Sequence, residues 1–329
     1  MIRCSIPILL FSLTLFSCEK AKNLADQAKS AVEDKISGKA GATKATQPDP
    51  ELQKLVDQAP DGVIFRKDLP FPKNVDVRTT VRQEIVGRTI QSSAIDTHSE
   101  ETKGIKTVIT KLERTGDQVR YTLEQSTFTA PPVEGAEAAK GGTADPLARM
   151  NPMSKPTTYQ KIGKIWQPSS TGGFRTAALA KLLSPVFDQL LIENALAPRT
   201  LWFGKRRFKA GDKILVNGST LPMLLVGNAT GSFNLTFEKS EAVEGHPCGV
   251  FSVTGNFNRK QFLDFEGDVL DQDASIESGK IWLSLLYPIV LKQELDTIQT
   301  TSSGGNGGSS ERRQGKVKLS LIREWKAKP

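Results

Sequence analysis

The 329-residue sequence has few cysteines, histidines and aromatic residues: 3 Cys, 2 His, and 7% Phe, Trp and Tyr together. So few cysteines exclude a disulfide-rich mini-protein. A zinc site needs three or four ligands, and most of the Cys and His residues would have to join it. The composition also excludes a polytopic membrane protein and a collagen-like repeat. A chain of this length can still bury a sizeable core without metal or disulfide crosslinks.

The sequence also lacks the motifs of several enzyme classes. It has no Gly-x-Ser-x-Gly elbow, no phosphate-binding Gly-x-x-x-x-Gly-Lys loop, no dinucleotide fingerprint and no His-Glu-x-x-His pair. We therefore expect that the chain is not an enzyme and that it binds no cofactor and no metal. A hydrolase with a dispersed pair of carboxylates needs no local motif and stays an alternative.

The first residues have the features of a secretory signal. Arg3 precedes an apolar stretch over residues 5–17 that is shorter than the roughly 20 residues of a membrane-spanning helix. A positive start, a brief apolar region and a small residue before a cleavage point are typical of a signal peptide. We expect residues 1–17 to be that signal peptide.

The residues Leu15-Phe16-Ser17-Cys18 resemble the lipobox of bacterial lipoproteins. The resemblance implies that Cys18 receives a diacylglycerol and that the chain is cut just before it. Two or more acyl chains hold a protein lastingly on a membrane, at about 0.8 kcal/mol per buried CH₂. The implied location is the cell envelope, facing the periplasm, and Glu19 favours the outer membrane over the inner one. The alternative is an ordinary signal, cleaved or uncleaved, with an unmodified Cys18.

Composition divides the remaining chain into a tether and a body. Residues 18–50 lack aromatic side chains and predict a lipid-anchored flexible tether. Residues 51–329 are expected to form a single β-rich domain with a long loop at 129–158 and a Gly/Ser loop at 302–310. Two domains separated near residues 130–158 are the alternative.

Alternating apolar and polar residues predict strands at 75–85, 105–114, 119–128, 159–166, 230–239, 248–257, 276–286, 289–300 and 316–325. Leucines at helical spacing over residues 175–196 predict one long buried helix, kinked or divided at Pro185, with Ser184 as a cap. Hairpins without a βαβ rhythm indicate a mainly β, or α+β, fold. The expected architecture is a strongly curved antiparallel sheet, or half-barrel, packed on this Leu-rich helix.

This element order over residues 60–328 loosely resembles the lipid-carrier and lipoprotein-carrier domains of the bacterial envelope. The resemblance implies a curved half-barrel that holds a helix over its apolar concave face. A ligand would then contact Leu182, Phe187 and Leu190, although a closed core would use the same positions. We expect a membrane-anchored, non-catalytic envelope lipoprotein that binds a hydrophobic or lipid ligand or a partner protein, and no nucleic acid. A structural or assembly lipoprotein with a closed core is the alternative.

Three groups of residues could carry other chemistry. His246 and Cys248 could form a thiol–imidazole pair, but Cys248 begins an apolar alternating strand where a cysteine acts as a small hydrophobe. An acidic run could bind calcium or form the solvated face of a strand: Asp264, Glu266, Asp268, Asp271 and Asp273. A basic run could be a solvated hairpin face or attract anionic lipid headgroups: Lys205, Arg206, Arg207, Lys209 and Lys213.

The lipobox makes a direct prediction about Cys18. Radiolabelled palmitate should enter the full chain in a bacterial host, and Cys18→Ser should abolish the label while Cys4→Ser keeps it. A purified product that still begins at Met1 and contains no label would contradict the anchor.

Overall fold

The computed structural model describes residues 47–66, 68–70, 72–93, 95–129, 156–163, 165–169, 184, 187–188, 190–191, 206–217, 229–262, 269–304 and 310–327. Within these residues the protein is nearly all β-strand. The expected signal peptide, Cys18 and the tether up to residue 46 lie outside them, as do most of the loops expected at 129–158 and 302–310.

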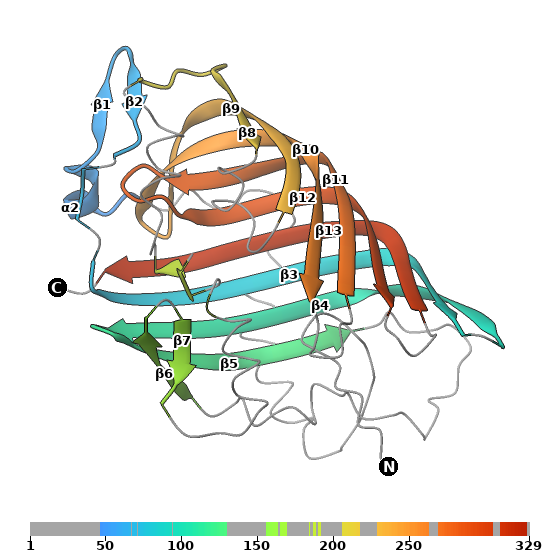
Figure 1. Ribbon diagram of the computed structural model, residues 1–329. Helices are drawn as coiled ribbons and strands as arrows, with labels where there is room; N and C mark the ends of the chain where they lie inside the picture. The colour runs from blue at the N-terminus through green and yellow to red at the C-terminus, as the bar shows by residue number, and fades with distance from the viewer. Residues whose placement is uncertain are drawn as a thin grey trace.

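The main sheet has eleven antiparallel strands in the order β7-β6-β5-β4-β3-β13-β12-β11-β10-β9-β8. Their bounds are β3 Asn74–Ser92, β4 Thr97–Thr115, β5 Gln118–Thr129, β6 Thr157–Ile162, β7 Ile165–Pro168, β8 Lys213–Asn217, β9 Ala229–Val243, β10 His246–Phe262, β11 Val269–Ser284, β12 Val290–Gly304 and β13 Ser310–Ala327. A second sheet pairs β1 (Asp57–Ala59) with β2 (Gly62–Ile64), after the short helix α2 (Pro50–Gln53). Figure 1 shows β1, β2 and α2 at one end of the main sheet.

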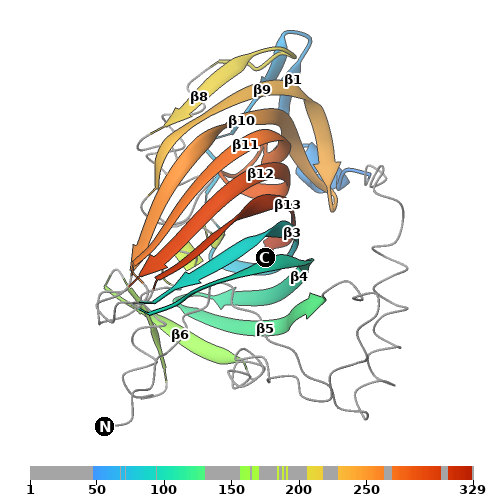
Figure 2. The same ribbon diagram turned by 90° about the vertical axis from the view of Figure 1, so that its right-hand side faces the viewer.

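The last strand of the chain pairs with the first long one. β13 and β3 are in register from Ser310↔Ser92 to Ala327↔Val75, without a bulge. β5 and β6, which flank residues 130–156, also pair with each other. The strands on both sides of that stretch therefore belong to one continuous sheet, which curves strongly (Figure 2).

Two glycines face each other on β3 and β13. Gly87 and Gly315 are directly paired, and a Cβ on Gly87 would lie 2.5 Å from the carbonyl oxygen of Gln314. A Cβ on Gly315 would lie 2.5 Å from the Cα of Gly87. Glycine inside a strand often marks such a close backbone approach. Only glycines allow these two strands to come this close.

Buried apolar side chains form two clusters. The first contains side chains of β9–β12 together with Val63, Phe65 and Phe208. The second contains side chains of β3–β7 and of parts of β9–β13, including Trp166, Trp282 and Trp325, together with Phe187, Leu190 and Leu191. Both clusters lie toward the end of the sheet that holds the start of β3 and the end of β13. The other half of each of these two strands contains few buried residues.

The expected antiparallel sheet is present, but the expected packing on one long Leu-rich helix is wrong. Among the described residues the one helix with defined bounds is α2, which has four residues. Of residues 175–196, helical backbone is described only at Ser184, Phe187, Asp188 and Leu190. The Ser184 hydroxyl, expected to cap a helix, instead accepts a hydrogen bond from the Trp166 amide at 2.8 Å. Pro185 next to it has no amide hydrogen and disfavours a continuous helix.

The sequence also predicted a single strand over residues 159–166. The structure has a hairpin there, β6 and β7, which turns at Gly163 with φ of 64°. Glycine adopts this left-handed conformation without steric cost. The other predicted strands are all present, and most are longer than expected.

The Gly87–Gly315 contact can be tested by substitution. Gly87→Ala should lower the free energy of unfolding by about 1–3 kcal/mol, because the new Cβ overlaps the backbone of β13. Val86→Thr, at a neighbouring side chain that is 56% exposed, should change it by about 0.5 kcal/mol or less. Equal denaturation midpoints for the two variants would show that the strands do not approach this closely.

Candidate functional site

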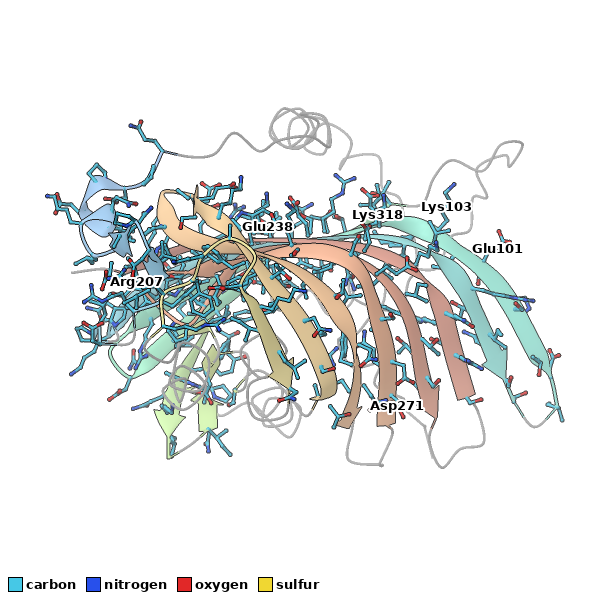
Figure 3. The ribbon with its side chains drawn as sticks, turned by 90° about the horizontal axis from the view of Figure 1, so that it is seen from above. Glu101, Lys103, Arg207, Glu238, Asp271 and Lys318 are labelled. Carbon is cyan, nitrogen blue, oxygen red and sulfur yellow. The ribbon has the colours of Figure 1, made fainter. Side chains whose placement is uncertain are left out.

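One face of the main sheet, which we call the inner face, is defined by directly paired residues. Paired residues of antiparallel strands point to the same side of a sheet. The first row is Phe237, Phe251, Ile281, Gln293, Leu321, Val81 and Val108. Phe65, outside the main sheet, packs against this row with its ring centroid 5.6 Å from that of Phe251. Lys103 and Lys318 belong to the opposite, outer face and point away from the concave side (Figure 3).

The inner face changes from apolar to polar along the strands. The first row is mostly apolar and buried. A second row is Phe233, Gly255, Ile276, Thr297, Val317, Ile85 and Gly104. A row farther along is Ala229, Arg259, Gln272, Thr301, Arg313, Thr89 and Glu100. One continuous surface thus offers an apolar end and a polar end.

Positive charge predominates among the residues that the register places on the inner face of β3, β4 and β9–β13. The cations are Lys106, Arg114, Arg259, Arg313 and Arg323, and the acids are Glu100 and Glu311. Both acids lie in the polar rows, and Glu311 forms an ion pair with Arg313 at 2.5 Å. The rows that contain Lys106 and Arg323 hold Thr79, Thr110, Gln83, Leu319 and Leu295, none of them acidic.

Arg323 and Thr79 are directly paired on the inner face. Arg323 donates one hydrogen bond, from a terminal guanidinium nitrogen to the carbonyl oxygen of Val290 at 2.7 Å. Within the described part of the chain, the buried Arg323 Nε and the buried Thr79 Oγ1 have no hydrogen-bond partner. Desolvation lowers the pKa of Arg323 to about 10, so the guanidinium remains charged at neutral pH. Such groups are costly to bury unless an acceptor reaches them.

A hydrogen-bond ladder crosses the polar half of the inner face. Arg259 donates to Gln272 Oε1 at 2.6 Å, and Gln272 donates to Gln299 Oε1 at 3.1 Å. Gln299 then donates to the Thr297 hydroxyl at 2.9 Å, which donates to the carbonyl oxygen of Val317 at 2.9 Å. The ladder joins β10, β11, β12 and β13 and holds these polar side chains in fixed positions.

Two of the three expected ligand-contacting residues, Phe187 and Leu190, belong to the second apolar cluster. Phe187 is fully buried, with ring centroids 5.1 Å from Tyr159, 5.4 Å from Tyr121 and 6.2 Å from Trp166. The Leu190 carbonyl oxygen accepts a hydrogen bond from Trp325 Nε1 at 3.2 Å. Leu182 lies outside the described residues. The structure therefore brings Phe187 and Leu190 together in one core.

His246 and Cys248 do not form a thiol–imidazole pair. His246 Nε2 contacts the Ser284 hydroxyl at 2.6 Å, and that hydroxyl oxygen accepts the amides of Leu286 and Tyr287 at 3.0 Å each. The hydroxyl proton is therefore directed at Nε2, which makes the imidazole neutral. Cys248 Sγ donates to the His246 carbonyl oxygen at 3.3 Å, and burial raises the pKa of this thiol. This arrangement closes the turn between β11 and β12 and does not produce a thiolate.

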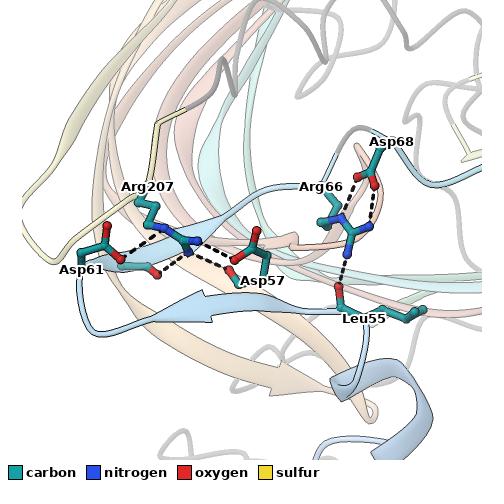
Figure 4. Close-up of polar contacts among 7 residues, drawn as sticks. Leu55, Asp57, Asp61, Arg66, Asp68 and Arg207 are labelled. Atoms are coloured by element: carbon teal, nitrogen blue, oxygen red, sulfur yellow. Dashed lines mark hydrogen bonds and ion pairs between the residues drawn. The ribbon is translucent and has the colours of Figure 1, made fainter.

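The basic run is partly committed to the attachment of β1 and β2. Arg207 contacts Asp57 Oδ1 at 2.7 Å and Asp61 Oδ1 at 3.2 Å, and donates to the Gly62 carbonyl oxygen at 3.2 Å (Figure 4). The Arg206 guanidinium lies 4.4 Å from the ring centroid of Phe208. Lys205 lies outside the described residues, while Lys209 and Lys213 are exposed. At least Arg207 is therefore a structural residue.

The acidic run is described only at Asp271 and Asp273. Both accept from Asn258 Nδ2, at 2.7 and 2.9 Å. The register places all three on the outer face. No group of three or more His, Cys, Asp or Glu side chains that could hold a metal occurs among the described residues. Within the same residues no helix is long and apolar enough to span a membrane.

Sequence reasoning missed the inner-face cations, although Arg323 carries a visible signal. It stands in phase with Val317, Leu319, Leu321 and Trp325, where an alternating strand with one buried face should have an apolar residue. A charged residue in the buried phase points to a special environment. Lys106, two residues before the inward-facing Val108, gives the same signal on β4.

The buried His246 makes stability depend on pH. Burial lowers its pKa to about 4, with Asp49 acting in the opposite direction, against about 6.5 for an unfolded histidine. Between these values the unfolded chain binds more protons, so the free energy of unfolding should fall by on the order of 3 kcal/mol as pH falls from 6.5 to 4. His246→Gln should flatten this dependence, and His98→Gln, at an exposed position of β4, should preserve it. Equal slopes for wild type and His246→Gln in chemical denaturation would contradict this.

Comparisons with known proteins show little likeness. No protein-family model matches the sequence, and no curated protein does. Among solved structures, Neisserial surface protein A covers 76% of this chain and 95% of its own, at 8% identity and a TM-score of 0.17. A DUF1329 family protein from Desulfovibrio piger covers 76% of this chain and 85% of its own, at 8% identity and a TM-score of 0.13. At such scores neither likeness supports an argument about this chain.

Proposed function

We propose that this chain is a membrane-anchored, non-catalytic envelope lipoprotein whose inner face binds a hydrophobic or lipid ligand. The lipobox-like residues before Cys18 support the anchor. The observation that carries the proposal is the inner face itself, on which apolar and polar rows succeed one another along the same strands. A lipid likewise combines an apolar part with a polar part.

Two buried polar groups of this surface support the proposal. Thr79 lies on the inner face with 9% exposure, and neither its hydroxyl nor the buried Nε of the directly paired Arg323 has a hydrogen-bond partner in the described part of the chain. Burying polar groups costs free energy unless hydrogen bonds replace those lost to water. Purely structural sheets usually fill such positions with apolar residues. In a ligand-binding surface, a few such polar groups orient the ligand.

A structural or assembly lipoprotein with a closed core is the second candidate. The aromatic cluster around Phe187 favours it, because protein side chains surround that ring. The two functions differ in whether the polar part of the inner face contacts a ligand or only the chain itself.

Native mass spectrometry of the full chain, purified from a bacterial membrane in a mild detergent, tests the proposal. We expect a bound species with the mass of a lipid. Chloroform extraction should release this lipid, and mass spectrometry of the extract should identify it. An unrelated lipoprotein purified in the same way gives the background of carried-over lipid. Repeated preparations with no lipid above that background would favour the closed core.

A further inference from the structure

Two buried donors that need an acceptor lie on the inner face toward the end of the sheet where β3 begins and β13 ends. Arg323 Nε and Thr79 Oγ1 lie on adjacent strands in direct register, and neither has a partner in the described part of the chain. The Thr79 side chain is nine-tenths buried. A guanidinium N–H can only donate, and a hydroxyl can donate to an anion. One anionic oxygen between them would satisfy both.

We propose that the ligand is an anionic amphiphile, with an acidic head group bound by Arg323 and Thr79 and an acyl chain extended along the inner face. This inference rests on the proposed function and names the ligand class. The head group is identified by its charge and its acceptor oxygens. A carboxylate or a phosphate ester would both fit.

Charge on the inner face favours an acidic head over a neutral one. Hydrogen bonds from arginine to an anionic oxygen are about twice as strong as those between neutral groups. Lys106, also buried on this face, adds a second positive charge about four residues farther along the sheet. The acids of this face, Glu100 and Glu311, lie in the polar rows beyond Gly87 and Gly315.

The acyl chain has an apolar path that begins beside Arg323. Leu321 and Val317 follow on β13, with the half-buried Leu319 between them. Leu295 on β12 and Ile85 on β3 flank these residues in register and are also half-buried. From Arg323 to Val317 the strand spans about 20 Å, on the scale of a long acyl chain.

The test uses the full chain in a non-ionic detergent with two photoreactive probes, a C16 fatty acid and its methyl ester. The probes share the acyl chain and differ only in the charge of the head. We expect the acid to reach half-maximal labelling at about tenfold lower concentration than the ester, the difference of one charge-assisted hydrogen bond. Labelled peptides should map to the inner face of β3, β12 and β13. Inorganic phosphate should not compete at the concentration of the acid.

Matched variants assign the preference to the head-group residues. Arg323→Gln should abolish the preference for the acid, and Arg323→Lys should keep most of it. Thr79→Val retains the side-chain shape and should also reduce the preference. It serves as the test if Arg323→Gln proves unstable. Lys318→Gln changes an exposed cation on the outer face of the same strand and should behave as wild type.

The outcomes separate the two proposals. Equal labelling of inner-face peptides by acid and ester would overturn the anionic head group and leave lipid binding intact. Labelling by neither probe would overturn lipid binding and the head group with it. If inorganic phosphate, at the concentration of the acid probe, prevents labelling by that probe, the site binds a free anion, which would contradict an amphiphile.

Discussion

The unbroken register between β13 and β3 decides which side chains share a face, and the candidate site depends on it. Side chains alternate between the two faces with a period of two, so a slip of one residue would exchange the faces. The neighbouring pair in the chain shows the contrast. Glu324 and Arg78 pair on the outer face and form an ion pair at 3.3 Å, where water and counter-charges are available. Arg323 and Thr79, one residue away, face inward without such a partner among the described residues.

The inner face belongs to a strongly curved sheet (Figure 2). Glycines at 87 and 315 let two central strands approach closely, and the two apolar clusters hold one end of the sheet. The remaining length of the strands is free of that packing and is organised instead by the ladder from Arg259 to Thr297. The proposed head-group residues Arg323 and Thr79 lie next to the packed end, beside Trp325 and Val77, and the proposed acyl path runs from there toward the ladder. The ion pairs of Arg207 with Asp57 and Asp61 attach β1 and β2 beside the first apolar cluster.

Much of the fold could be predicted, because period-two alternation is a local signal. The hairpin at Gly116 and the turn at Gly245 follow directly from residues that tolerate positive φ. The absence of the long helix from the described residues could not be predicted from a local signal. Leucines over residues 175–196 have helical spacing, but Ser184 binds the backbone of Trp166, a tertiary contact that no local pattern contains. The site was missed for a related reason: alternation places Arg323 in the apolar phase, yet only the register with β3 puts it beside Thr79.

The central claim is that the inner face holds a ligand with an acidic head. An experimental structure of the full chain, purified from a bacterial membrane without added lipid, tests it most directly. The account predicts elongated density along Leu321, Leu319 and Val317 that ends within hydrogen-bond distance of Arg323 Nε and Thr79 Oγ1. Protein side chains filling that whole path, with a backbone or carboxylate oxygen of the chain itself on Arg323, would contradict it.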